Sequence, residues 1–397
     1  MKNQSILDIE VSRKRLLIRA DLNVPINDGK ITDDTRIKRF CQGMLKLLKK
    51  GAKLIIMTHM GRPKGIKQST LSTKVLINSL EKYLEKEAVF SDNCIEHNTI
   101  EISKNLKDHQ ILLCENLRFY NEEEENDLNF AKQLSLLGDY FVNDAFSCSH
   151  RAHASTEGIT KFIPSFSGPM LNEEISALKI ALENPQEPSL AIIGGAKVSS
   201  KISVLKNLVR KLDGIIIGGG MANTFLFAKG APMGKSMYES NYIDTVSEIE
   251  NLAKKNNCNL YLPIDVVVAG EFKEDAPNYT IPFNQCPKES MILDVGENSI
   301  ELFKEVIEKS KTILWNGPLG AFEIKPFNNA TKVLANFTAT MTKNKKCISV
   351  AGGGDTLSAL NSANASKEFT YVSSAGGAFL EWLEGKDLPG IKALRVK

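Results

Sequence analysis

Short apolar runs alternate with amphipathic stretches along the whole chain. The apolar runs are KRLLIRA, KLIIMTH, ILLCEN and YFVNDAF in the first half, and SLAIIGG, GIIIGGG, TILWNG, KCISVAG and FTYVSS in the second. Runs of this length are typical of strands buried on both faces, and their alternation with helical patterns favours parallel sheets covered by helices. The pattern therefore predicts an α/β protein.

The segment from Asp33 to Gly51 has the clearest helical period, and Gly51 is a C-terminal stop signal. We expect an amphipathic helix packed on a sheet. Its predicted apolar face consists of Ile37, Phe40, Cys41, Met44, Leu45 and Leu48.

Composition narrows the class of protein. A chain of 397 residues is too long for one ordinary core, which suggests two lobes. The 50 basic and 47 acidic side chains leave a net charge of +3, far from the basic excess of non-specific nucleic-acid binders. The start MKNQSILDIE has no apolar signal region, and no run of 18 apolar residues occurs, so we expect a cytoplasmic protein that neither binds nucleic acid nor spans a membrane.

The seven cysteines are an odd number, widely spaced and without a C-x-x-C pair. This pattern favours reduced thiols over a disulfide framework or a zinc site. They are Cys41, Cys94, Cys114, Cys148, Cys258, Cys286 and Cys347.

The two halves differ in chemistry. Eight of the ten arginines and all five histidines precede residue 154, whereas 19 of the 27 glycines follow residue 185. Arginine forks hold small anions, and glycine turns at helix N-termini let backbone N–H groups hold nucleotide phosphates. We therefore expect an anionic-substrate lobe over 1–170 and a nucleotide lobe over 186–384, joined by a hinge helix over 171–185 near Pro185 and Pro188.

Four successive strand ends in the first half carry polar side chains, in RADLNVP, HMGRP, ENLRF and NDAFSCSHRAHAST. Parallel strands end at one edge of a sheet, so we expect a shared anion pocket, although Asp-x-Asn before proline is also an ordinary turn. Arg36 opposes the helix dipole, which suggests a negative ligand. A simple ion pair with Asp33 or Asp34 is the alternative. The HRAH spacing is a poor zinc signature.

Glycine turns follow the strands of the second half. GGAKVSSKI places Lys197 and Lys201 after such a turn, where they can reach a phosphate or be ordinary solvated lysines. In AGGGDTLSAL a strand runs into glycines and a helix that starts near Asp355, an arrangement suited to Mg²⁺ beside nucleotide phosphates, or to helix capping by Asp355 or Thr356. Glu323 of WNGPLGAFE is a candidate partner for ribose hydroxyls, or simply an exposed acid.

Together these motifs resemble the phosphoglycerate kinase family from about residue 15 to residue 391. The matching peptides, in the family's order, are RADLNVP, HMGRP, ENLRF, NDAF with HRAH, GGAKVSSK, GGGMANTF, LPIDVV, WNGPLGAFE, GGGDT and SSAGGA with LEGKDLPG. The resemblance implies two Rossmann-like lobes joined by a helix, with the tail from about 385 to 397 returning to the first. It also implies a monomer that transfers the acyl phosphate of 1,3-bisphosphoglycerate to MgADP, directly and in line, with hinge closure.

The resemblance carries roles onto individual residues. It implies that the phosphorylated glycerate is bound by Asp21, Asn23, Arg36, His59, Arg62, Arg118 and Arg151, with His150 and His153 close by. It implies that the nucleotide is served by Lys197, Lys201, Gly296, Asn316, Glu323, Gly353, Gly354, Asp355 and Thr356. Asp355 acts there through Mg²⁺, and the catalytic charges are expected on Arg36, Lys197 and Lys201.

Three places depart from the usual family pattern. Ser147, Cys148 and Ser149 stand where Gly-Thr-Ala is common, Ala375 stands at a usual glycine, and Glu297 stands at a usual proline. We expect altered kinetics at most. Two other functions stay open: a dehydrogenase, disfavoured by the missing G-x-G-x-x-G fingerprint, and a non-catalytic nucleotide-binding module, which would be expected to lose Arg36 or Lys197.

Overall fold

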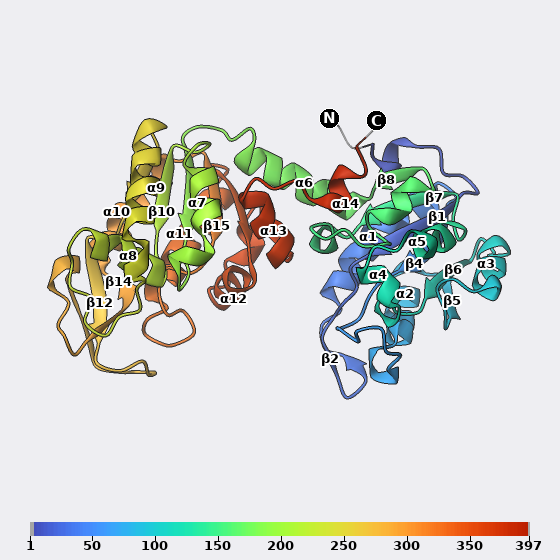
Figure 1. Cartoon of the computed structure of the whole chain (residues 1–397), viewed down its shortest axis with the longest axis horizontal. Helices are drawn as coiled ribbons and strands as arrows, with labels where there is room; N and C mark the ends of the chain where they lie inside the picture. The colour runs from blue at the N-terminus through green and yellow to red at the C-terminus, as the bar shows by residue number, and fades with distance from the viewer. Residues whose placement is uncertain (1–3, 396–397) are drawn as a thin grey trace. The chain divides into compact units, whose positions relative to one another are not determined.

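The chain forms two compact units, seen in a computed structural model that describes residues 4–395. Unit 1 runs up to Glu174 and also takes in the residues from Asp387 onward, and unit 2 is Ile175–Lys386 (Figure 1). The chain leaves unit 1 along helix α6 (Pro169–Leu182) and returns to it with α14 (Pro389–Lys392). Unit 1 is therefore built from two separate stretches of sequence.

Unit 1 contains a six-stranded parallel sheet in the order β5-β6-β4-β1-β7-β8. Its four central strands coincide with the apolar runs of the sequence. The edge strands β5 and β8 were not predicted, because one is only partly buried and the other has three residues. The strands are β1 (Arg15–Ala20), β4 (Lys53–Met57), β5 (Glu87–Ser91), β6 (Gln110–Cys114), β7 (Tyr140–Asp144) and β8 (Ser165–Ser167), beside a small hairpin of β2 (Ile26–Asn27) and β3 (Lys30–Ile31).

Helices cover the sheet of unit 1. The predicted amphipathic helix is α1, and it packs with α2 over the face that carries Ile18 and Ile56. Leu17 and Ile55, which point the other way, are equally buried. The apolar face of α1 is buried at Ile37, Phe40, Cys41, Met44 and Leu47, whereas Leu45 and Leu48 lie at its half-buried margin. The helices are α1 (Thr35–Lys49), α2 (Ile77–Leu84), α3 (His97–Lys104), α4 (Asn121–Glu124) and α5 (Leu128–Ser135).

Unit 2 contains a second six-stranded parallel sheet, in the order β11-β10-β9-β15-β16-β17. Its strands are β9 (Ser189–Ile193), β10 (Gly214–Ile217), β11 (Asn259–Tyr261), β15 (Thr312–Asn316), β16 (Ile348–Gly352) and β17 (Tyr371–Ser373). The prediction of an α/β fold with two parallel sheets is confirmed.

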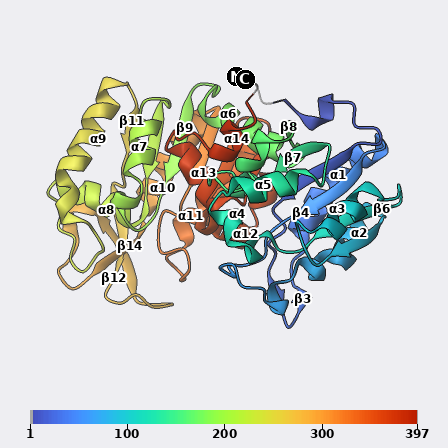
Figure 2. The ribbon, with the colours of Figure 1, turned by 45° about the vertical axis from the view of Figure 1, so that its right-hand side comes forward.

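The helices of unit 2 fall into two groups by their mutual contacts. In the first group α7 packs on α9 and α13, and α8 packs on α9; α7 and α9 run side by side in Figure 2. In the second group α11 packs on α10 and α12. The helices are α7 (Ile202–Leu208), α8 (Gly219–Ala228), α9 (Ile243–Lys255), α10 (Glu297–Lys309), α11 (Asn329–Lys343), α12 (Gly354–Ser362) and α13 (Gly376–Leu383).

A three-stranded antiparallel sheet, in the order β13-β12-β14, adds to unit 2 and was not predicted. Strand β13 (Asn278–Pro282) is almost wholly exposed and therefore has no apolar pattern. The other strands are β12 (Asp265–Ala269) and β14 (Met291–Val295), and β14 packs against α8 (Figure 1). This small sheet supplies one wall of the cavity described below.

The sequence also predicts reduced cysteines and no membrane-spanning segment. All seven cysteines are buried with free thiols. Within residues 4–395, every helix is too short or too polar for a membrane crossing.

The core of unit 1 predicts one stability effect. Phe40 of α1 is 1% exposed, so Phe40→Ala removes a ring and leaves a cavity, which costs about 3–5 kcal/mol of unfolding free energy. Urea denaturation followed by circular dichroism should show a lower midpoint for the variant. Leu128→Ala is the control, because Leu128 is 45% exposed; an equal loss from both variants would contradict this account of the core.

Candidate functional site

The carboxyl ends of four adjacent strands meet at one edge of the unit 1 sheet. Strands β6, β4, β1 and β7 are neighbours and run parallel. The segments that follow them supply Asp21, His59, Arg118 and His150. The predicted gathering of these strand ends at one edge is confirmed.

Arg36 turns back from the first turn of α1 to the loop after β1. Its Nη1 donates to Asp21 Oδ2 at 2.9 Å and to the Asn23 carbonyl at 3.1 Å. The alternative partners are engaged elsewhere: Asp33 accepts from the Thr35 N–H, and Asp34 accepts from a tyrosine hydroxyl. The ion pair of Arg36 is therefore with a proposed substrate residue.

Arg19 lies at the centre of this region and was not among the predicted site residues. Its guanidinium is fully buried and donates to Ser155 Oγ at 2.8 Å and toward His59 Nδ1 at 3.2 Å. Glu123, also fully buried, lies 4.0 Å away and accepts from the Ser155 hydroxyl. An unpaired buried guanidinium has a large desolvation free energy. The hydrogen bonds and the nearby carboxylate offset this cost and hold Arg19 in place.

Burial alters the proton affinity of the groups around Arg19. Desolvation raises the pKa of Glu123, although Arg19 opposes it. Desolvation and then Arg19 lower the pKa of His59 well below its ordinary value. The same two causes lower the pKa of His153 to about 4. Both imidazoles are thus neutral at pH 7, and the positive charge of the region comes from arginines.

The other predicted residues of unit 1 lie around this network. Asn23 Oδ1 accepts from the Gly61 N–H at 3.0 Å, and Arg118 Nη1 donates to the Gly61 carbonyl at 2.8 Å. Arg151 Nε donates to His150 Nε2 at 3.2 Å. Arg62 and Arg151 are exposed, as required of cations that meet a ligand from solvent.

Asp21, His59 and Cys148 bring a carboxylate, an imidazole and a thiol within 4.8 Å of one another. Arg19 Nη2 is 3.2 Å from the imidazole nitrogen and 3.6 Å from the sulfur. The cation that these groups already face is a guanidinium, so their arrangement suits an anion site better than a metal site.

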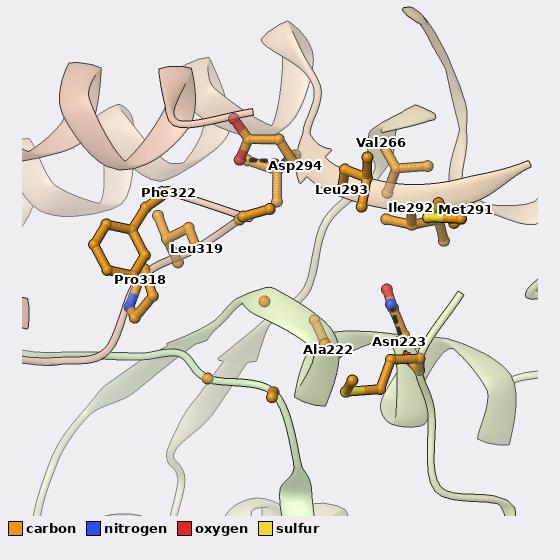
Figure 3. A pocket seen from close by; sticks show the side chains of 18 of the residues that line it. Ala222, Asn223, Val266, Met291, Ile292, Leu293, Asp294, Pro318, Leu319 and Phe322 are labelled. Carbon is orange, nitrogen blue, oxygen red and sulfur yellow. Dashed lines mark hydrogen bonds between the residues drawn. The ribbon is translucent and has the colours of Figure 1, made fainter. Parts of the chain in front are cut away.

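Unit 2 contains a cavity of about 440 Å³ between α8 and β14. Figure 3 shows Ala222 and Asn223 of α8 facing Ile292 and Leu293 of β14, with Pro318 and Phe322 at one end. The lining is mostly apolar, and its charged members are Lys235, Asp294, Glu323 and Asp355. A flat aromatic base with a charged tail suits such a cavity.

A polar cluster joins three strand ends of unit 2. Lys201 Nζ donates to Asn316 Oδ1, and Asn316 Nδ2 donates to the Gly352 carbonyl at 2.7 Å. Thr356 Oγ1 accepts from the Gly317 N–H at 2.8 Å, so Thr356 ties β15 to α12 and does not cap the helix. Burial lowers the pKa of Lys201 to about 8, against the attraction of Asp355 and Glu384.

Glycines make this cluster possible. Gly353 has φ +105°, and a Cβ there would lie 2.8 Å from the Asn316 amide nitrogen. A Cβ at Gly194 would lie 1.8 Å from the Pro318 carbonyl oxygen. These contacts let β9, β15 and β16 end close together.

Three other nucleotide candidates have different surroundings. Lys197 is exposed at the start of the turn Val198–Ser200, and Gly354 is exposed at the start of α12. Gly296 is not among the residues that line the cavity, although its neighbour Val295 is. Asp265 accepts from the Asn298 and Ser299 N–H groups at 3.0 and 2.8 Å, so a protein carboxylate already occupies the N-terminus of α10.

The presence of two α/β units agrees with the comparisons to known proteins. The family model described as phosphoglycerate kinase matches residues 6–386. The chain belongs to the phosphoglycerate kinase family. It is a kinase that transfers a phosphoryl group, and the family name gives it a role in glycolysis.

Individual phosphoglycerate kinases are similar over almost their whole length. The protein of Ruegeria pomeroyi is 48% identical over 387 residues, covering 98% of this chain and 97% of its own. That of Bradyrhizobium diazoefficiens is 48% identical over 396 residues, with 100% and 99% covered. The solved phosphoglycerate kinase of Coxiella burnetii has a TM-score of 0.91 at 40% identity, covering 99% of both chains.

The departures from the usual phosphoglycerate kinase pattern have visible surroundings. Ala375, at the N-terminus of α13, is 4% exposed, so its methyl group packs inside unit 2. Ser149 Oγ accepts from Asn143 Nδ2 at 3.0 Å. Ser147 donates to Asp21, a contact that a glycine at this position cannot make.

The depressed pKa of His153 predicts a pH effect on stability. Below pH 6.5 the unfolded imidazole gains a proton that the folded one takes up only near pH 4, so this contribution to stability falls as the pH falls. At pH 5.5 it amounts to about 1.4 kcal/mol. His153→Gln should therefore lose less unfolding free energy than the parent between pH 7.5 and 5.5, measured by urea denaturation.

His97→Gln is the control for this comparison, because His97 is exposed. Equal pH dependence in the parent and in His153→Gln would show that the folded imidazole is protonated at pH 5.5.

Proposed function

We propose that unit 1 binds 3-phosphoglycerate or 1,3-bisphosphoglycerate and that unit 2 binds ADP or ATP. The observation that carries this proposal is the segregation of chemistry: arginines and neutral histidines gather at one sheet edge of unit 1. In unit 2 an apolar cavity adjoins glycine turns and helix N-termini. A multiply charged glycerate needs the first set of groups, and a nucleotide needs the second.

In this proposal some residues of unit 1 attract the substrate by charge and others orient it by hydrogen bonds. Arg36, Arg62, Arg118 and Arg151 supply positive charge to the phosphate and carboxylate. The neutral imidazoles of His59 and His153 supply directional hydrogen bonds. Asp21, Asn23 and the His150 side chain add further polar contacts.

The nucleotide contacts of unit 2 are divided in the same way. The base occupies the cavity, and Glu323, exposed at its edge, accepts from ribose hydroxyls. The backbone at Gly353 and Gly354 meets the phosphates at the N-terminus of α12. Asn316 and Thr356 hold that turn in place from within the fold.

The Asp355 carboxylate fits a magnesium ion that accompanies the nucleotide. It is exposed in the first turn of α12 and lines the cavity, and a carboxylate oxygen is the type of ligand that Mg²⁺ prefers. When bound, the ion neutralises charge on the nucleotide phosphates. Asp355 would hold the ion from the first turn of α12.

The transfer itself needs no nucleophilic side chain. The carboxylate of 3-phosphoglycerate attacks the γ-phosphorus of ATP directly, the bond from that phosphorus to the β,γ-bridging oxygen breaks, and the products are 1,3-bisphosphoglycerate and ADP. Arg36 and Lys197 stabilise the charge of the group in transit, and Lys201 assists. Lys201 donates to Asn316, and its lowered pKa reflects the burial of its ammonium group. Positioning and charge neutralisation then account for catalysis.

Because the two substrates are assigned to different units, turnover requires the units to approach one another. We place the hinge in the chain segments that connect them, around α6 and residues 385–387. The enzyme is proposed to act in the cytoplasm, which its buried free thiols support. It is proposed to act as a monomer on the family resemblance alone.

Removing the catalytic charges tests the proposed roles. Arg36→Ala and Lys197→Ala should each lower kcat with 3-phosphoglycerate and MgATP by 10²-fold or more, about the effect of losing one preorganised charge. The measurement is a coupled steady-state assay. Wild-type protein that binds both ligands without turnover would identify the non-catalytic module instead.

Arg39→Ala and Lys206→Ala are the matched controls, since both side chains form ion pairs with surface glutamates, Glu173 and Glu248. Losses as large as those of the site variants would show that the assay reports general damage. Thermal stabilisation by NADH but not by ADP would indicate a dehydrogenase.

The metal role of Asp355 is tested separately. Asp355→Asn should raise the Mg²⁺ concentration for half-maximal binding of a fluorescent ADP analogue about tenfold or more, because a neutral amide is a weaker ligand for a hard cation. Asp244→Asn is the control, since Asp244 is also exposed in the first turn of a helix, α9. An unchanged magnesium requirement in Asp355→Asn would exclude this residue as the metal ligand.

A further inference from the structure

The carboxylate of Asp21 is shared between two side chains that come from different parts of unit 1. Its Oδ2 accepts from Arg36 Nη1 at 2.9 Å and also from the Ser147 hydroxyl. Its Oδ1 accepts from the Asn23 N–H at 3.3 Å. One oxygen atom thus connects the helix α1 with the turn Phe146–Cys148 that follows β7.

The shared carboxylate is important because Arg36 must make two interactions: one with Asp21 and, in the proposed reaction, one with the phosphoryl group. Its Nη1 is held by Asp21 and by the Asn23 carbonyl, while Nε and Nη2 form no hydrogen bond within residues 4–395. Under the proposed function, the same guanidinium must also contact the phosphoryl group in transit. Any shift toward that group weakens its bond to Asp21.

A weakened bond would be costly for Asp21 by itself. Its side chain is only 14% exposed, so solvent cannot fully replace a lost donor. Removing one partner from a mostly buried carboxylate costs more than an average hydrogen bond contributes. A second donor on the same oxygen reduces that cost.

We propose that Ser147 is a positioning residue that holds Asp21 in place and ionised when Arg36 shifts toward the transferring phosphoryl group. The inference rests on the proposed function and adds to it a residue that contacts no substrate. Ser147 acts through Asp21, and Asp21 acts through Arg36.

The charges that face Asp21 support this role. Burial raises the pKa of Asp21, but Arg36, then His59, Ser147 and Arg19, outweigh it and lower the pKa below the usual range. The neutral thiol of Cys148 is the other titratable group of the cluster, with its pKa raised by burial. Loss of the serine hydroxyl must therefore raise the pKa of Asp21.

The test is Ser147→Ala in the coupled assay with 3-phosphoglycerate and MgATP. We expect kcat to fall about tenfold, because a hydrogen bond to a charged group is lost in the transition state. The KM for 3-phosphoglycerate should change less than threefold. The acid limb of the kcat profile should move to higher pH, and Ser147→Thr, which keeps a hydroxyl, should restore most of the activity.

Ser149→Ala is the matched control. It removes a hydroxyl from the end of the same turn, where Ser149 Oγ bonds Asn143 and the Ala145 carbonyl and does not contact Asp21. Its acid limb should stay at the position of the wild type. A lower melting temperature is acceptable in either variant, because the pH profile is read on folded enzyme.

Two results would overturn the inference. One is wild-type kcat and an unmoved acid limb in Ser147→Ala; the other is a loss of activity that Ser147→Thr does not relieve and that leaves the acid limb unmoved. Both require an active wild type. An inactive wild type would instead contradict the proposed function on which the inference rests.

Discussion

The parallel alignment of strands is the constraint on which both proposed sites depend. The carboxyl ends of parallel strands lie at the same edge of a sheet. Residues far apart in the sequence therefore meet there because of strand direction alone. In unit 1 the edge after β1, β4, β6 and β7 brings together Asp21, His59 and Arg118. In unit 2 the edge after β9, β15 and β16 brings together Lys201, Asn316 and Gly353.

The two sheet edges are built from different kinds of residue. Unit 1 must keep positive charge close together without a ligand, and it does so by giving buried Arg19 a carboxylate partner, Glu123, and by leaving His59 and His153 neutral. Unit 2 must bring three strand ends close together, and it does so with glycines at positions 194 and 353, where a Cβ would collide with Pro318 and Asn316. Arginine usage in one half and glycine usage in the other are the sequence traces of these two solutions.

Much of the fold could be predicted from the sequence because buried central strands leave an unbroken apolar run. Strand β13 could not be predicted, since almost all of its residues are exposed and its stability comes from pairing with β12. Most of the buried face of α1 was predicted correctly. Leu47 was missed because a hydrophobic pattern does not distinguish it from its neighbour Leu48. The edge strand β8 is too short to have a period at all.

The positions of the candidate residues in the fold could be predicted where charge itself is the signal, and their roles stay predictions. Asp21, Arg36 and Asp355 follow strand ends or open helices, which a pattern can locate. Arg19 was missed because it lies inside a strand, where an arginine is normally directed to solvent. Gly296 was assigned to the nucleotide through its motif, and that role stays a prediction. The Asp265 carboxylate at the N-terminus of the same helix is a partner that only a three-dimensional contact reveals.

The second stretch of unit 1, which begins at Asp387, affects when unit 1 can be completed during synthesis. Asn143 Nδ2 donates to the Gly390 carbonyl at 3.2 Å, a contact across 247 residues, and the Gly390 N–H donates to the Ser149 carbonyl at 2.9 Å. A ribosome finishes the sheet of unit 1 long before it reaches Gly390. The turn that carries Ser147 and precedes His150 therefore gains these two hydrogen bonds only after Gly390 has been synthesised.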